Sequence, residues 1–279
     1  MKLQQKRKVY YKFLKMSNWF SNNKVINNIS IEDRGLQYGD GLFETIAIRK
    51  GKLRLWEYHL SRLKKGCKIL SLKIPSDDFL KKSIINTYHD SELNHSPAIA
   101  KIIITAGKGK RGYGRKKNTI SSELFSIFPA TQVDPINYKN GVELTLCKTR
   151  LAVNSITAGL KTLNRLEQVL AKIELEGTHF FEGLTMDSEN NIICGTMSNI
   201  FFVKENEIFV FNNNFFYENW NEIYKDDLLE FNLLLENIEI IKTINENKTN
   251  LIDLNIRNLF KEYENKNLAL IFIEESKNN

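Results

Sequence analysis

The chain has 279 residues, of which 42% are hydrophobic, and this composition excludes a disordered chain and allows one large core or two of moderate size. The formal net charge is +7, and no apolar run approaches the roughly 20 residues that span a bilayer. The three cysteines are scattered and lack metal-ligand spacing, so we expect a reduced, cytoplasmic compartment and no metal site.

The basic excess has two interpretations. It indicates either an acidic partner or small anionic substrates, or else the Lys-, Asn- and Ile-rich composition of a chain encoded by AT-rich DNA. Because the basic residues do not gather into one stripe with interleaved aromatics, we expect neither nucleic acid nor a membrane as a partner. Residues 1–15 form a basic tail without an apolar run of signal-peptide length, and we expect the fold to begin near Met16.

The elements predicted for the N-terminal half follow from the period of the apolar residues. Period-2 alternation and β-branched runs predict strands, and apolar residues at helical spacing predict helices. In chain order these are strands in 24–33 and 42–55, helices in 58–72 and 76–89, and strands in 98–107 and 123–130.

The best linker candidate is the segment 130–134, which lies between Pro129 and Pro135. After it we expect a strand in 142–148, a helix from Asn164, strands with tight turns in 181–211, and a helical run in 222–235. We therefore predict an N-terminal α/β lobe of residues 16–129 and a C-terminal α/β lobe of residues 130–279.

The helix from Asn164 is predicted in detail. Leu163, Leu166, Val169, Leu170 and Ile173 recur at helical spacing and form one apolar stripe. Asn164 is placed to cap the helix start, and Glu167 three residues on completes a capping-box-like pair. Lys161 comes just before this start, where a cation is disfavoured by about a few tenths of a kcal/mol, so the place suits a neutral amine.

Four other segments carry candidate functional residues. Each alone is typical of an ordinary turn, a solvated charge or a surface loop. They are the Gly-rich segment DRGLQYGDGLFET (33–45), HLSRL (59–63) with His59 and Arg62 on one helix face, the basic loop GKGKRGYG (107–114), and CGTMSNIFFV (194–203), in which Ser198 and Asn199 follow a Gly turn.

Taken together, the order and spacing of these segments and of GLKTLNRLEQVLAK (159–172) resemble the fold-type IV pyridoxal-phosphate family, which includes branched-chain and D-amino-acid aminotransferases. Within this family, the motifs are most similar to those of the aminodeoxychorismate lyases. KTLNRLEQ and the RGY loop distinguish these lyases from the aminotransferases better than the other motifs do. The resemblance covers roughly residues 17–210. It implies an α+β fold of two α/β lobes, with pyridoxal 5'-phosphate between them, in a homodimer.

The resemblance also implies roles for individual residues. Lys161 would carry the cofactor covalently, which needs a neutral amine, and burial and nearby positive charge favour that form. Arg62 matches the arginine that binds the cofactor phosphate. The remaining cofactor contacts would come from Cys194, Ser198, Asn199, Ile223 and Tyr224.

For the lyases, the implied reaction eliminates pyruvate from 4-amino-4-deoxychorismate and yields 4-aminobenzoate, a folate precursor. Lys161 would move the proton from the ring carbon that bears nitrogen. The substrate is a dianion, and Arg111, Tyr113 and Tyr38 are the expected contacts to it.

The sequence departs from the family pattern at several positions. Cys194 stands where relatives place a glutamate against the pyridine nitrogen, and Ala106 where they often have arginine. In 219–231, the segment matching the phosphate-binding loop, Glu222 replaces glycine and Lys225 replaces arginine. The segment 265–273 lacks the hydroxyls of the corresponding element in relatives. Two alternatives therefore stay open: a degenerate scaffold with little or no catalysis, and an aminotransferase of the same fold.

Overall fold

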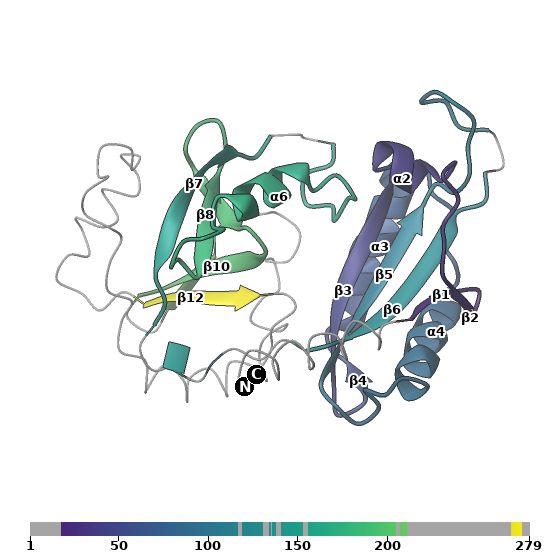
Figure 1. Cartoon of the computed structure of the whole chain (residues 1–279), viewed down its shortest axis with the longest axis horizontal. Coiled ribbons are helices and arrows are strands. Elements are labelled where there is room, and N and C mark those ends of the chain that lie inside the picture. The colour runs from purple at the N-terminus through teal and green to yellow at the C-terminus, as the bar shows by residue number, and fades with distance from the viewer. Residues whose placement is uncertain are drawn as a thin grey trace. The chain divides into compact units, whose positions relative to one another are not determined.

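The structure is a computed structural model that describes residues 18–116, 119–130, 134, 136–137, 141–152, 156–204, 207–210 and 269–274. The chain divides into two compact units (Figure 1). Of the described residues, the first unit contains 18–130 together with Leu160–Asn164, and the second contains the others. The mixture of helices and strands confirms the α+β fold class.

The first unit is built on a six-stranded antiparallel sheet with strand order β2-β1-β6-β5-β3-β4. The strands are β1 (Trp19–Ser21), β2 (Lys24–Ile26), β3 (Gly41–Arg49), β4 (Lys52–Leu53), β5 (Ala98–Thr105) and β6 (Ser122–Pro129). The β-branched run of β5 lies at the centre of the sheet, where Ile102 and Ile104 are fully buried. The strands predicted in 98–107 and 123–130 are therefore confirmed.

In the described part of the first unit, three helices accompany the sheet: α2 (Arg34–Tyr38), α3 (Trp56–Ile69) and α4 (Asp77–His89). The Ser76 hydroxyl caps α4 by accepting a hydrogen bond from the Phe79 N–H. α3 packs on β3 and α4 on β6, so both cover the sheet and share one hydrophobic core with it. The two long helices were predicted from their period, but the short helix α2 was not, because a Gly-rich segment is more typical of a turn.

The lysine segment 160–164 packs with the first unit, although it falls within residues 130–279, the predicted C-terminal lobe. The segment adds an antiparallel bridge to β3 between Leu42 and Thr162. The Phe43 N–H donates to the Lys161 carbonyl at 2.8 Å, and the Leu163 N–H donates to the Gly41 carbonyl at 3.0 Å. These backbone bonds place Lys161 beside the first half of β3.

The described residues of the second unit form two small sheets. β7 (Leu144–Arg150), β8 (Glu182–Met186) and β9 (Ile192–Gly195) form one, with β7 parallel to β8 and β9 antiparallel to it. β10 (Ser198–Lys204), β11 (Glu207–Val210) and β12 (Ala269–Glu274) form the other, which is antiparallel with β10 in the middle. Helix α6 (Leu166–Ile173) packs against β7 and β8.

The predicted cap of α6 is wrong. The helix begins at Leu166, and its N-cap residue Arg165 makes no side-chain cap bond. The Asn164 side chain instead donates to the Gly39 carbonyl at 3.3 Å, and Glu167 accepts from the Ala152 N–H. Both side chains therefore bond to distant backbone and not to the helix start. The predicted apolar stripe is also mostly exposed, with Leu166 70% exposed and Val169 50%.

Several expectations fall on parts of the chain outside the described residues. These are the basic tail 1–15, the helical run 222–235, and the residues Glu222, Ile223, Tyr224 and Lys225. Within the described part, no helix is both long enough and apolar enough to cross a membrane. No group of three His, Cys, Asp or Glu side chains that could bind a metal ion occurs in that same part.

Candidate active site

A buried ion pair lies between β3 and α3 in the first unit. Arg62 donates from Nε to Glu44 Oε1 at 2.7 Å and from Nη2 to Oε2 at 2.6 Å, so the contact is bidentate. His59, one helical turn before Arg62, places Nδ1 2.7 Å from Glu44 Oε2. All three side chains are buried. The helix face that carries His59 and Arg62 is therefore not solvated, because Glu44 on β3 supplies the counter-ion.

The charges of this cluster affect one another. Burial alone would raise the pKa of Glu44, but the charge and hydrogen bonds of Arg62, with those of His59, lower it to about 2. Burial lowers the pKa of His59, and the Glu44 carboxylate opposes this shift while Arg62 and Lys161 add to it. The cluster thus contains an ionised carboxylate and a guanidinium, and Lys161 is near enough to act on the same imidazole.

The Lys161 side chain shares an aromatic neighbour with a second lysine. Its Nζ lies 5.2 Å from the ring centroid of Phe43, and the Nζ of Lys101 on β5 lies 5.4 Å from the same centroid. Lys161 is half-buried. Burial lowers the pKa of Lys101. Two amines therefore approach one ring beside β3, and the second of them was missed because a lysine inside an apolar strand has no motif to mark it.

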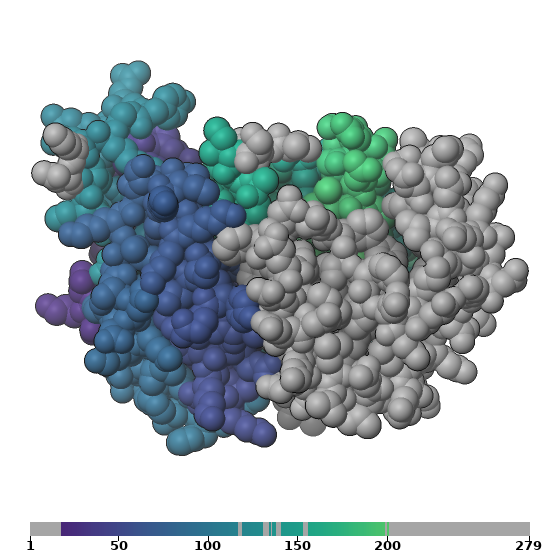
Figure 2. All heavy atoms as spheres, turned by 180° about the vertical axis from the view of Figure 1, so that it is seen from behind, coloured from purple at the N-terminus to yellow at the C-terminus, as the bar shows by residue number. Residues whose placement is uncertain are grey.

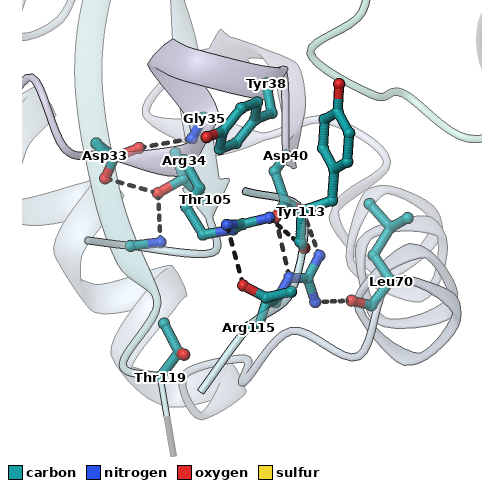
Figure 3. A network of polar contacts seen from close by, with 12 residues as sticks. Asp33, Arg34, Gly35, Tyr38, Asp40, Leu70, Thr105, Tyr113, Arg115 and Thr119 are labelled. Carbon is teal, nitrogen blue, oxygen red and sulfur yellow. Dashed lines mark hydrogen bonds and ion pairs between the residues drawn. The ribbon is translucent and has the colours of Figure 1, made fainter. Parts of the chain in front are cut away.

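The basic loop forms a separate part of the first unit. Residues 107–114 follow β5, and this loop projects from the rest of the unit at the upper left of Figure 2. Arg111 is exposed and Tyr113 is 86% exposed. The Tyr113 ring meets the Tyr38 ring edge-on, with centroids 5.5 Å apart (Figure 3). The structure therefore brings two of the three predicted substrate contacts, Tyr38 and Tyr113, together.

A carboxylate that the sequence analysis did not single out, that of Glu182, organises the site candidates of the second unit. Glu182 accepts hydrogen bonds from the Thr196 and Ser198 hydroxyls, the latter at 3.0 Å, and from the Gly183 N–H at 3.0 Å. Burial would raise the pKa of Glu182, but the Thr196 hydroxyl and the Gly183 N–H outweigh it and lower the pKa, with Lys172 and Ser198 adding to this effect. Ser198 thus begins β10 bonded to an ionised side chain.

Cys194 lies in the same unit on β9. Its Sγ is 3.4 Å from the Thr185 hydroxyl oxygen on β8. Burial raises the pKa of the Cys194 thiol, and the nearby Glu182 carboxylate acts in the same direction, although Thr185 and Arg165 oppose the shift. The thiol is therefore uncharged at neutral pH. The backbone of Asn199 pairs with Ile273 between β10 and β12.

The predicted site residues thus fall into groups. Lys161 and Arg62 both lie beside β3 in the first unit, and Tyr38, Arg111 and Tyr113 belong to the same unit, where the two tyrosine rings meet at the basic loop. Cys194, Ser198 and Asn199 belong to the second unit. Sequence reasoning missed Glu44, Asp40, Arg34 and Lys101. The first three lie inside the Gly-rich segment 33–45. The signal available there was a set of charged residues placed directly beside glycines or apolar residues, which indicates buried charge.

Known proteins resemble this chain over most of the described part. The amino-transferase class IV family model matches residues 41–212. An aminodeoxychorismate lyase of Vibrio harveyi is 37% identical over 185 residues. That match covers 65% of this chain and 66% of the relative, so it spans just under two thirds of the relative's length.

Solved structures agree with this match. The crystal structure of a 4-amino-4-deoxychorismate lyase from Pseudomonas aeruginosa superposes with a TM-score of 0.62 and 32% identity, over 78% of each chain. A branched-chain amino acid aminotransferase from Escherichia coli gives a TM-score of 0.63 at 19% identity, over 79% of this chain and 74% of that one, and shows the fold alone. These findings confirm the resemblance drawn from the motifs, and the chain belongs to the amino-transferase class IV family.

Proposed function

We propose that this chain is an aminodeoxychorismate lyase, which uses pyridoxal 5'-phosphate to eliminate pyruvate from 4-amino-4-deoxychorismate and release 4-aminobenzoate. The observation that carries the proposal is that Lys161 and Arg62 both lie beside β3 in one unit, bonded to Phe43 and Glu44, in a chain similar to two lyases over most of the described part. Family members use pyridoxal phosphate as their cofactor.

The residues beside β3 fit this cofactor. An aldehyde needs an amine, and a phosphate needs a cation, preferably a guanidinium. Lys161 supplies the amine, and the charge of Arg62 is already oriented by Glu44, so binding a phosphate would not need to order it first. When bound, the cofactor supplies a ring that withdraws electrons from the carbon next to the attached nitrogen.

Lys161 has two tasks in this proposal. Its Nζ would hold the cofactor, and as a free amine it would take the proton from the substrate ring carbon that bears nitrogen and pass it to the leaving pyruvate. The neighbouring Lys101, half-buried on β5, is a candidate contact for one substrate carboxylate because both amines approach Phe43. Arg111 and Tyr113 are candidates for the other carboxylate and the ring.

Cys194 weakens the electron withdrawal that this reaction needs. A protonated thiol cannot neutralise a pyridinium as a carboxylate does. A lyase tolerates this loss better than an aminotransferase because formation of an aromatic product drives the elimination. Cys194 therefore favours a lyase over an aminotransferase among the members of the family.

We also expect the chain to act as a homodimer in the cytoplasm. The apolar side chains on the exposed face of α6 support the dimer, since a monomer rarely exposes four such residues on two turns of helix. The four residues are Leu166, Val169, Leu170 and Ile173.

The test is conversion of enzymatically made aminodeoxychorismate to 4-aminobenzoate by the full chain with added pyridoxal phosphate. We expect turnover by the parent and none by Lys161→Ala, with Lys101→Ala as a matched lysine control that keeps the covalently bound cofactor. Borohydride followed by mass spectrometry should then give an adduct on the Lys161 peptide in the parent and in Lys101→Ala.

The same experiment separates the alternatives. Absence of any adduct with cofactor in excess would contradict the enzymatic proposal and leave the scaffold interpretation, which the substitution at Cys194 favours. An adduct without 4-aminobenzoate, together with amino transfer to pyruvate from an amino donor, would identify an aminotransferase.

A further inference from the structure

One guanidinium contacts three successive carbonyl groups of the basic loop. Arg34 Nη1 donates to the carbonyls of Gly112 at 2.9 Å and Gly114 at 3.4 Å, and its Nη2 donates to that of Tyr113 at 2.8 Å. The Arg34 side chain is buried. A buried charge is costly unless it is fully hydrogen-bonded. Since the loop carbonyls supply these bonds, the loop conformation and the burial of Arg34 depend on each other.

Asp40 joins this arginine to a second one. It accepts from Arg34 Nε at 2.8 Å and from Arg115 Nε at 2.9 Å, and Arg115 Nη2 also donates to it. Arg115 Nη1 donates to the Leu70 carbonyl just after α3 (Figure 3). Burial would raise the pKa of Asp40, but the hydrogen bonds from Arg115 and Arg34 lower it. The carboxylate therefore links Arg34 to Arg115, and through Arg115 to the end of the helix that carries Arg62.

Tyr38 fixes the tip of the loop. Its hydroxyl accepts a hydrogen bond from the Gly112 N–H at 3.1 Å, and its ring lies under the Arg34 guanidinium, 4.9 Å from the centroid. The Tyr113 ring packs edge-on against it (Figure 3). An exposed aromatic that is nevertheless ordered loses conformational entropy without the gain of burial. The Tyr113 ring is therefore held in place while its surface stays accessible to a ligand.

The network also connects the loop to the lysine segment. Gly39 and Gly41 flank Asp40, and their carbonyls accept from the Asn164 side chain at 3.3 Å and from the Leu163 N–H at 3.0 Å. A Cβ at Gly109 would lie 2.8 Å from Arg34 Cδ, so the backbone of the loop's first half also passes close to the arginine. Hydrogen bonds thus connect the basic loop, through Arg34 and Asp40, with the backbone beside Lys161.

We propose that Arg34 is a positioning residue for substrate binding: through Asp40 and Tyr38 it presents Arg111 and Tyr113 to the ring and carboxylate of the substrate. This inference rests on the proposed function, because it takes a cyclic carboxylate as the ligand. The expected consequence is a weakened affinity for such a ligand, with the attachment of the cofactor to Lys161 unaffected.

The experiment compares Arg34→Lys and Tyr38→Phe with the parent, all as full chains loaded with cofactor. Tyr88→Phe is the matched control, since it removes a hydroxyl that donates to the Ser96 carbonyl in the same unit but away from the loop. Three quantities are measured: KM and kcat for aminodeoxychorismate, the Kd of 4-aminobenzoate as a probe by titration, and amide hydrogen exchange at Gly112.

We expect KM and the probe Kd to rise roughly tenfold in Arg34→Lys and less in Tyr38→Phe. Arg34→Lys loses hydrogen bonds from a charged guanidinium to the loop carbonyls, whereas Tyr38→Phe loses one hydrogen bond between neutral groups. The Gly112 amide should exchange faster in both, while kcat, the cofactor absorbance and all values of Tyr88→Phe stay near those of the parent. A further variant, Arg34→Met, removes the positive charge altogether. It should bind the probe less tightly than Arg34→Lys, which keeps the charge.

The probe and the exchange rate separate this inference from the proposed function. An active parent whose KM and probe Kd do not change in Arg34→Lys overturns the inference alone. A parent that binds 4-aminobenzoate but does not make it overturns the lyase, and weaker probe binding by the variants then still supports the role of Arg34. A parent that does not bind the probe overturns the inference as well, as does an equal loss in Tyr88→Phe.

Discussion

The carboxylate of Glu44 is bonded to both Nε and Nη2 of Arg62, at 2.7 and 2.6 Å, and the two side chains are almost completely buried. The pair comes from two different elements, β3 and α3, so it fixes the helix against the strand as well as orienting the guanidinium. Because the arginine is the residue proposed to bind the cofactor phosphate, the same contact affects both stability and cofactor binding.

Glu44→Gln should destabilise the fold in a pH-dependent way. The pKa of Glu44 is about 2 against an ordinary 4.5, so its ionised form stabilises the fold above pH 4.5, and this contribution is lost as pH falls toward 2. At pH 7 the substitution leaves the Arg62 charge uncompensated and costs about 3–5 kcal/mol. At pH 3 the parent has lost about 2 kcal/mol of that contribution, so the gap should shrink.

Urea denaturation of parent and variant at pH 7 and pH 3 measures this gap. Glu92→Gln serves as the control, since Glu92 is exposed, and its difference from the parent should be small at both pH values. A gap that is equally large at pH 3 and pH 7 would show that protonation of Glu44 is not what links stability to pH.

Gly39→Ala should destabilise the chain and loosen the lysine segment. Gly39 has φ +63°, and a Cβ there would collide with the Asn164 side chain. The left-handed backbone costs about 1–2 kcal/mol for an L-residue, and the collision adds to it. The melting temperature should therefore fall, and the covalently bound cofactor should be reduced, because Asn164 lies three residues from Lys161.

Gly51→Ala is the matched control for that change. Gly51 also has a positive φ, +73°, but a Cβ there would meet nothing within 4 Å. It should lose only the backbone contribution and bind the cofactor normally. Equal losses of stability and of cofactor in the two variants would contradict the proposed contact between Gly39 and the lysine segment.

Cys194→Glu should increase the rate of elimination, because a carboxylate stabilises a protonated pyridine nitrogen where a thiol does not. Without cofactor the variant should be less stable, by about 1–3 kcal/mol, since a buried carboxylate is costly and Glu182 lies near enough to raise its pKa. Turnover by Cys194→Glu and Cys194→Gln is compared with the parent. If the glutamine variant is as fast as the glutamate variant, or if neither is faster than the parent, protonation of the ring nitrogen does not limit the rate of elimination.

Leu166→Glu should convert a dimer to a monomer. Leu166 is 70% exposed on α6, and a charge there would be desolvated in an interface between two copies. Light scattering after size-exclusion chromatography gives the mass of the variant and the parent. Ile120→Glu, at a residue 81% exposed in the first unit, is the control and should leave the mass unchanged. A parent that is already a monomer would contradict the dimer.

Much of this protein follows from sequence periodicity alone. The alternation in 42–49 and the β-branched run in 98–105 determined two central strands, and apolar spacing determined α3 and α4, because each signal is local. The motif order, through the resemblance it carries, pointed to the family and to Lys161 and Arg62.

The tertiary structure decided which side chains meet. Glu44 and Arg62 are 18 residues apart, Arg34 and Tyr113 are 79 apart, and Asn164 and Gly39 are 125 apart. No local pattern records such pairs, because their energy comes from the desolvation and charge of groups that only the fold brings together. For the same reason Asn164, a good cap by its residue type, bonds to a distant carbonyl and not to the helix that follows it.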